Sequence, residues 1–164
     1  MKITLDINKK TAVPVSKKIL EKIAEKTIKG TGMRFLEKKS INLSLVFLSA
    51  RKIKEINRKY RKIYSTTDVL SFSNFGDEKT LEREKSESID LGELLIDYEY
   101  IKKSAKVNRV GINIELAYVF SHGILHLLGI KHGKKMFALQ DKIVQELSPS
   151  TKSEKKLYVV SKRS

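Results

Sequence analysis

The positions of the histidines constrain the fold of this chain more than any other feature. All three occur between residues 122 and 132, in the segment HGILHLLGIKH. His122 and His126 are four residues apart, so on a helix they lie on one face, one turn apart. Gly129 follows, and glycine readily adopts the left-handed conformation that ends a helix. The pattern predicts a helix that ends in a glycine turn and a chain that brings His132 back to the same side.

Three imidazoles brought together in this way are suited to bind a metal ion. A catalytic zinc ion takes three protein ligands and keeps a fourth position open for water, whose pKa it lowers to near neutrality. The chain contains no cysteine, so a metal site must use His, Asp or Glu side chains. We expect His122, His126 and His132 to bind one zinc ion, although nickel or another divalent metal would also suit imidazole ligands.

The spacing HxxxHxxGxxH is also that of the metzincin proteases. Those enzymes carry a glutamate directly after the first histidine as the general base, and this chain has Gly123 at that position. A protease with this site would lack its proton acceptor. A small metalloprotease is therefore the weaker interpretation, which a peptidase activity dependent on His126 would revive.

The periodicity of apolar residues predicts a single α+β domain with a small mixed β-sheet packed with helices. We expect strands over residues 2–8, 41–48, 66–73 and 91–96. We expect helices over residues 14–30, 50–60, 98–106, 113–128 and 134–147. The polar, acidic residues 77–90 are expected to form an exposed loop between strands.

One domain boundary and a cellular location are predicted from composition. Pro149 and its serine neighbours predict the end of a domain that spans residues 1–148, followed by a basic C-terminal tail over residues 149–164. The N-terminus lacks the apolar region of a signal peptide, and no apolar stretch is long enough to span a bilayer. We therefore expect a cytoplasmic protein that does not associate with a membrane.

The charge of the chain indicates its partner. The formal net charge is +15, which favours a polyanion, most commonly nucleic acid. The densest basic cluster precedes the third expected strand, and it is our predicted track for an RNA backbone. A solvated helix face is the alternative interpretation. The cluster consists of Arg51, Lys52, Lys54, Arg58, Lys59, Arg61 and Lys62.

Three blocks of the chain resemble the YbeY family of bacterial endoribonucleases, also called rRNA maturation factors. The family signature is HGxLHLxGxDH, and residues 121–132 read SHGILHLLGIKH. A Tyr60-Arg61 pair precedes residues 67–72, TDVLSF, as in the family. Residues 91–93, LGE, resemble the family's LGD strand.

The chain also departs from the family pattern. Lys131 replaces the acid that usually precedes the third histidine, and Glu93 replaces an aspartate. The segment after His132 looks shorter and less acidic than usual, and the basic tail is additional. None of these departures touches an expected metal ligand.

The resemblance implies a metal-dependent, single-strand-specific endoribonuclease that acts in rRNA maturation and ribosome quality control. It implies that zinc-bound water or hydroxide acts together with a functional arginine, which maps onto Arg61; a guanidinium can bind a phosphate with two hydrogen bonds. The implied partners are single-stranded RNA or rRNA and the ribosome or its small subunit. Further substrate-binding residues are expected to be Arg58, Lys59, Lys62, Ser71 and Phe72.

An alternative of a different class stays open. The chain could be a non-catalytic RNA-binding factor of ribosome assembly with a structural metal, although structural zinc usually has a fourth protein ligand. Among the remaining candidates, Asp68 is expected to cap backbone donors at a strand end. Phe75 could line the cleft, and Tyr118 is expected to pack within its helix.

Overall fold

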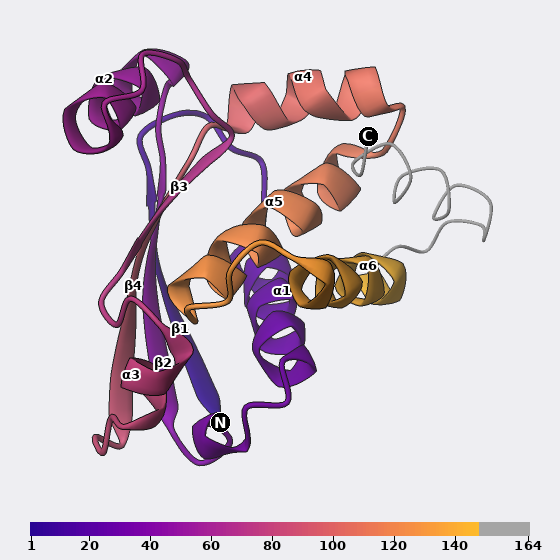
Figure 1. Cartoon of the computed structure of the whole chain (residues 1–164). Coiled ribbons are helices and arrows are strands. Elements are labelled where there is room, and N and C mark those ends of the chain that lie inside the picture. Colours follow the sequence, from indigo (N-terminus) through magenta and orange to yellow (C-terminus); the bar gives the residue numbers. More distant parts are fainter. Residues whose placement is uncertain (148–164) are drawn as a thin grey trace.

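The computed structural model describes residues 1–147, in which four strands form one mixed sheet with helices on both faces (Figure 1). The strands occur in the order β1-β2-β4-β3. β2 runs parallel to both β1 and β4, whereas β3 pairs antiparallel with β4 and forms an edge. The predicted α+β fold with a mixed sheet is therefore confirmed. The strands span Lys2–Lys9 (β1), Ser40–Phe47 (β2), Val69–Ser73 (β3) and Ser88–Ile96 (β4).

Helices α1, α2 and α4 begin where the chain supplies capping side chains. Ser16, Ser49 and Asp97 each accept a hydrogen bond from a backbone N–H of the first turn that follows, which satisfies donors that the helix itself leaves free. The five predicted helices are present, with a short 3₁₀ turn at Arg34–Leu36. The helices span Lys17–Gly30 (α1), Ala50–Arg61 (α2), Glu78–Glu82 (α3), Tyr98–Asn108 (α4), Ile112–Leu127 (α5) and Lys134–Leu147 (α6).

The two faces of the sheet carry different helices. Alternate residues of β2, such as Leu43 and Leu45, are buried in the main core together with residues of α1 and α5. On the other face, Leu70 and Leu95 pack against Ile53 of α2. Figure 1 shows α2 across the sheet from α1, α5 and α6. The period-two alternation of the strands therefore gives the sheet a large core on one face and a smaller core on the other.

Helix α5 packs closely on the sheet at Gly123. A Cβ atom there would be 2.9 Å from Cδ2 of Leu94 and 3.3 Å from Cγ2 of Val69, so a larger residue would require the Leu94 side chain or the helix to shift. Among the described residues, no single helix is long and apolar enough to cross a membrane. α4 and α5 would meet that criterion only as a pair, and the chain bends by 119° between them.

The expectation of a loop over residues 77–90 is wrong in part. Asp77 accepts a hydrogen bond from the backbone N–H of Thr80 (2.8 Å) and begins helix α3. Leu81 of that helix is fully buried in the main core, and β4 already begins at Ser88. One buried apolar residue is enough to anchor a turn of helix within a polar stretch. The predicted tail, residues 149–164, lies outside the described residues.

Candidate metal centre

The three histidines lie together at the C-terminal end of α5. His122 and His126 come from the helix, and His132 comes from the loop that follows it. Their Nε2 atoms form a triangle with sides of 3.1, 3.1 and 3.2 Å. Tetrahedral zinc ligands at about 2.0–2.1 Å from the ion are about 3.3–3.4 Å apart. The three imidazoles could therefore hold one metal ion.

The turn that brings His132 back depends on Gly129. This residue has φ +80°, and a Cβ atom there would lie 2.4 Å from backbone atoms of Asp77 and Glu78. The N–H of Gly129 donates to the carbonyl of His126 (3.0 Å), and the N–H of Ile130 donates to that of Leu125 (2.9 Å), as in a Schellman helix end. The predicted glycine turn is present, and the start of α3 packs directly against it.

A buried glutamine orients the first histidine. Oε1 of Gln140, on α6, lies 3.2 Å from Nδ1 of His122, and its Nε2 donates to the carbonyl of Tyr118 (3.3 Å). Because the amide nitrogen is used at Tyr118, the amide oxygen accepts from an N–H at Nδ1 of His122. This tautomer leaves the lone pair of Nε2 directed toward the other two histidines, as a metal ligand requires.

Sequence reasoning missed Gln140. Its signal is a polar residue on the apolar stripe of α6, between Met136 and Ile143, and the side chain is fully buried. Buried polar side chains of this kind generally serve a specific partner.

His126 is held in its neutral form. The pKa of His126 is lowered from 6.5 to about 4, mainly by burial and in addition by the charges of His122 and His132. A neutral imidazole is the form that binds a metal, so this residue does not need to lose a proton at neutral pH.

The histidines line a cavity of about 460 Å³ together with Arg61 and Ser71. Nη2 of Arg61, at the end of α2, donates to the backbone carbonyl of Ser71 on β3 (3.1 Å). This hydrogen bond holds the guanidinium at the edge of the cavity. The remaining lining residues are Thr67, Asp68, Val69, Tyr118 and Val119.

The structure also shows the positions of the three other candidate residues from the sequence, Asp68, Tyr118 and Phe75. Asp68 caps the start of β3, as expected, because its Oδ1 accepts from the N–H of Val69 (2.8 Å). Tyr118 is half-buried and lies parallel to the ring of His122, with centroids 6.4 Å apart, so it borders the site. Phe75 packs against the main core instead of lining this cavity.

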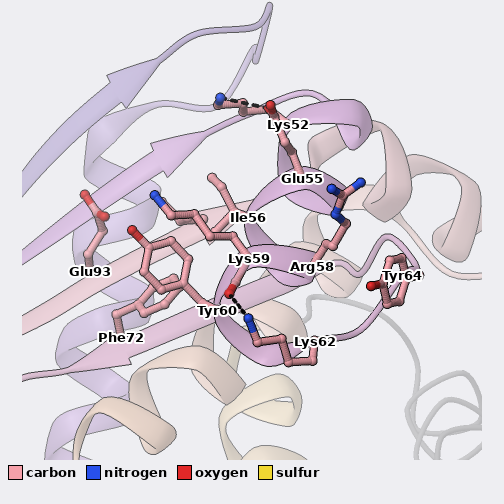
Figure 2. A pocket seen from close by; sticks show the side chains of 11 residues that line it. Lys52, Glu55, Ile56, Arg58, Lys59, Tyr60, Lys62, Tyr64, Phe72 and Glu93 are labelled. Atoms are coloured by element: carbon pink, nitrogen blue, oxygen red, sulfur yellow. Dashed lines mark hydrogen bonds and ion pairs between the residues drawn. The ribbon is translucent and has the colours of Figure 1, made fainter.

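The other expected substrate-binding residues line a different cavity. Arg58, Lys59, Lys62 and Phe72 surround a hollow of about 1020 Å³ between α2 and the opposite face of the sheet (Figure 2). The structure therefore divides the expected catalytic arginine and the expected substrate-binding residues into two groups. Arg61 and Ser71 lie with the histidines, and the other four lie around the second cavity.

Comparisons with known proteins agree on one family. The model of the family described as Endoribonuclease YbeY matches residues 5–148. A protein of Caldicellulosiruptor bescii named Endoribonuclease YbeY is 34% identical over 137 residues, which cover 78% of this chain and 87% of the relative. One of the same name from Thermodesulfovibrio yellowstonii is 38% identical over 113 residues, covering 65% and 67% of the two chains. A solution structure of a Thermotoga maritima protein superposes with a TM-score of 0.55 at 26% identity, over 88% of both chains.

Proposed function

The chain belongs to the YbeY endoribonuclease family, and on that basis we propose that it is a zinc-dependent enzyme that cleaves single-stranded RNA in rRNA maturation and ribosome quality control. One observation carries the proposal: three imidazole nitrogens, 3.1–3.2 Å apart, share a cavity with the guanidinium of Arg61. A ligand triad beside an anion-binding cation is an arrangement suited to phosphodiester cleavage.

In this proposal, His122, His126 and His132 hold the ion. When bound, a zinc ion supplies a Lewis acid and acidifies a water molecule at its open position. Gln140 keeps His122 in the ligand tautomer. Because all three ligands are neutral, the site keeps its full positive charge for an anionic substrate.

Arg61 binds the phosphate beside the ion. Its hydrogen bond to Ser71 restrains one side of the guanidinium, while the remaining N–H groups can donate to phosphate oxygens. The same donors can stabilise the charge that develops on the phosphate during cleavage. Ser71 contributes by positioning Arg61 through its backbone carbonyl.

The basic surface of α2 holds the flanking RNA, with Arg58, Lys59 and Lys62 as phosphate contacts and Phe72 as an aromatic contact. The proposed partners are rRNA and the ribosome or its small subunit, in the cytoplasm. The proposed functional domain is residues 1–148.

The position of Gly123 argues against the protease alternative. A Cβ atom there would contact Leu94 and Val69 of the sheet, so a metzincin-type glutamate would fit at this position only if the Leu94 side chain or the helix shifted. A structural metal is disfavoured because the three histidines face an open cavity and are not closed by a fourth protein ligand among the described residues.

The test is a paired measurement on purified wild-type protein and on His126→Ala, with Gln145→Ala on α6 as a control. Zinc content is measured by mass spectrometry, and cleavage is measured on a single-stranded rRNA fragment. We expect about one zinc ion per chain in the wild type and the control, and the loss of both zinc and cleavage in His126→Ala. Cleavage that persists after the metal is lost would be contamination, and the assembly-factor interpretation would then take precedence.

A further inference from the structure

The second cavity lies beside the metal centre but on the other side of the edge strand. Arg61 and Ser71 face the metal centre, whereas their sequence neighbours Tyr60 and Phe72 line the second cavity. Successive side chains of a strand point to opposite faces, so β3 separates the two sites by its own thickness. Since β3 is an edge of the sheet, an extended strand of RNA can pass around that edge from one site to the other.

Exposed aromatic rings distinguish this cavity from an ordinary basic surface. Tyr60 is 61% exposed and Tyr64 is 71% exposed. The ring of Tyr60 meets that of Phe72 edge to face, with centroids 5.7 Å apart and an interplanar angle of 76°. Phe72 in turn packs on the small core beneath α2. The Tyr60 ring is therefore supported by Phe72 and largely open to solvent, so that it can stack with a ligand ring when the flexible Lys59 side chain moves aside.

Cations surround these rings. Nζ of Lys59 lies 5.1 Å from the centroid of the Tyr60 ring, and Cζ of Arg58 lies 5.8 Å from that of Tyr64. Lys62 lines the cavity as well, and Figure 2 shows the cationic side chains interleaved with the two tyrosines. Proteins that bind single-stranded nucleic acid combine stacking rings with a basic track in this way.

Two carboxylates make the second cavity more suitable for a base than for a phosphate. Glu55 pairs with Lys52 (2.8 Å), and Glu93 accepts a hydrogen bond from the hydroxyl of Ser44 (3.2 Å). Both carboxylates line the cavity, where they would repel a phosphate but accept hydrogen bonds from the amino groups of a base. The cavity therefore suits a base, and the cations around it suit the adjoining phosphates.

We propose that this cavity is a stacking subsite for an unpaired base of the RNA strand whose phosphate lies at the metal centre. The base stacks on Tyr60, and Arg58, Lys59 and Lys62 contact the phosphates on either side. This inference rests on the proposed function for the identity of the strand, and it adds an aromatic determinant of substrate binding.

The test measures binding, so that it does not depend on cleavage. Full-length protein is titrated into two fluorescent 2′-O-methyl oligonucleotides of equal length, one carrying bases and the other an abasic backbone. A gel checks that both remain intact. The variants are Tyr60→Ala and Tyr60→Phe, with Tyr100→Ala as the control, because Tyr100 is an exposed tyrosine on α4 that lines neither cavity.

We expect Tyr60→Ala to weaken binding of the base-carrying oligonucleotide by about 5- to 100-fold. Tyr60→Phe should keep wild-type affinity because the ring remains, and Tyr100→Ala should not change it. On the abasic oligonucleotide, Tyr60→Ala should bind like the wild type. The proposal is overturned if Tyr60→Ala binds the base-carrying oligonucleotide as tightly as the wild type, or if it loses the same affinity for both.

The result separates the two proposals. If the wild type shows the ring-dependent binding but does not cleave RNA, the subsite stands and the proposed activity fails. If cleavage depends on His126 but binding does not depend on the ring at position 60, the activity stands and the subsite is wrong.

Discussion

The two cavities on either side of β3 are built on different principles. In the metal centre, side chains from α2, α5, α6 and the loop after α5 converge. Two of them are oriented by a further group, because Gln140 holds His122 and the carbonyl of Ser71 holds Arg61. In the second cavity, most of the functional side chains are long, exposed and carried by α2 and the residues directly after it. Catalysis requires side chains that are held in position before the substrate binds. A flexible strand of RNA, in contrast, can be bound by aromatic rings and charged side chains that adapt to it.

This comparison predicts how substitutions should behave. Changes in the metal centre should be large and should affect metal affinity or the rate of the chemical step. Changes in the second cavity should be smaller and should affect binding and its dependence on salt.

The largest effect among variants that keep the metal is expected at Arg61. We expect Arg61→Ala to lower kcat by about 100- to 1,000-fold, because the loss of one hydrogen-bond donor to a developing negative charge has an effect of this size in other enzymes. The zinc content should stay at the wild-type level. Steady-state cleavage of a single-stranded RNA measures kcat and KM, and zinc analysis measures the metal content. Arg58→Ala is the matched control, for which we expect a smaller effect, mainly on KM. Equal losses of kcat in both variants would remove the distinction between the cavities.

The next largest effect is expected at Gln140. Gln140→Ala removes the acceptor for Nδ1 of His122 and should weaken zinc binding by about 10- to 100-fold, measured by competition with a chelator. Gln140→Glu keeps an acceptor and should retain tight binding. Gln145→Ala, on the exposed side of the same helix, should bind zinc like the wild type. Unchanged zinc affinity in Gln140→Ala would show that the metal centre does not depend on this orientation.

The smallest effect is expected at the edge of the second cavity. Lys59→Ala should weaken oligonucleotide binding by several-fold and reduce the slope of log affinity against log salt by about 1, because one fewer counterion is released. Titrations at several salt concentrations measure the slope. Lys18→Ala, on the exposed surface of α1, controls for net charge and should leave the slope nearly unchanged. A slope that is the same in Lys59→Ala and the wild type would exclude a phosphate contact there.

Features that depend on short stretches of chain were predictable. The helices, the strands and the glycine turn follow from local periodicity and from backbone preferences that act over a few residues. Helix α3 was missed because one buried leucine, Leu81, anchors it within a polar stretch, and burial depends on the rest of the fold. Ser71 and Phe72 were expected to act at one site, but the alternation of a strand places them on opposite faces of the sheet.

The sequence by itself determined that this chain carries a histidine triad, because a four-residue spacing and a glycine turn bring His122, His126 and His132 together through local geometry. Only the tertiary structure decided what surrounds the triad. Gln140 reaches His122 because α6 packs on α5, and Arg61 reaches the cavity because α2 packs against Leu70 of the edge strand β3. Such contacts join residues far apart in the chain, so they depend on how the helices pack on the sheet, and the neighbouring residues do not identify the partner in each contact.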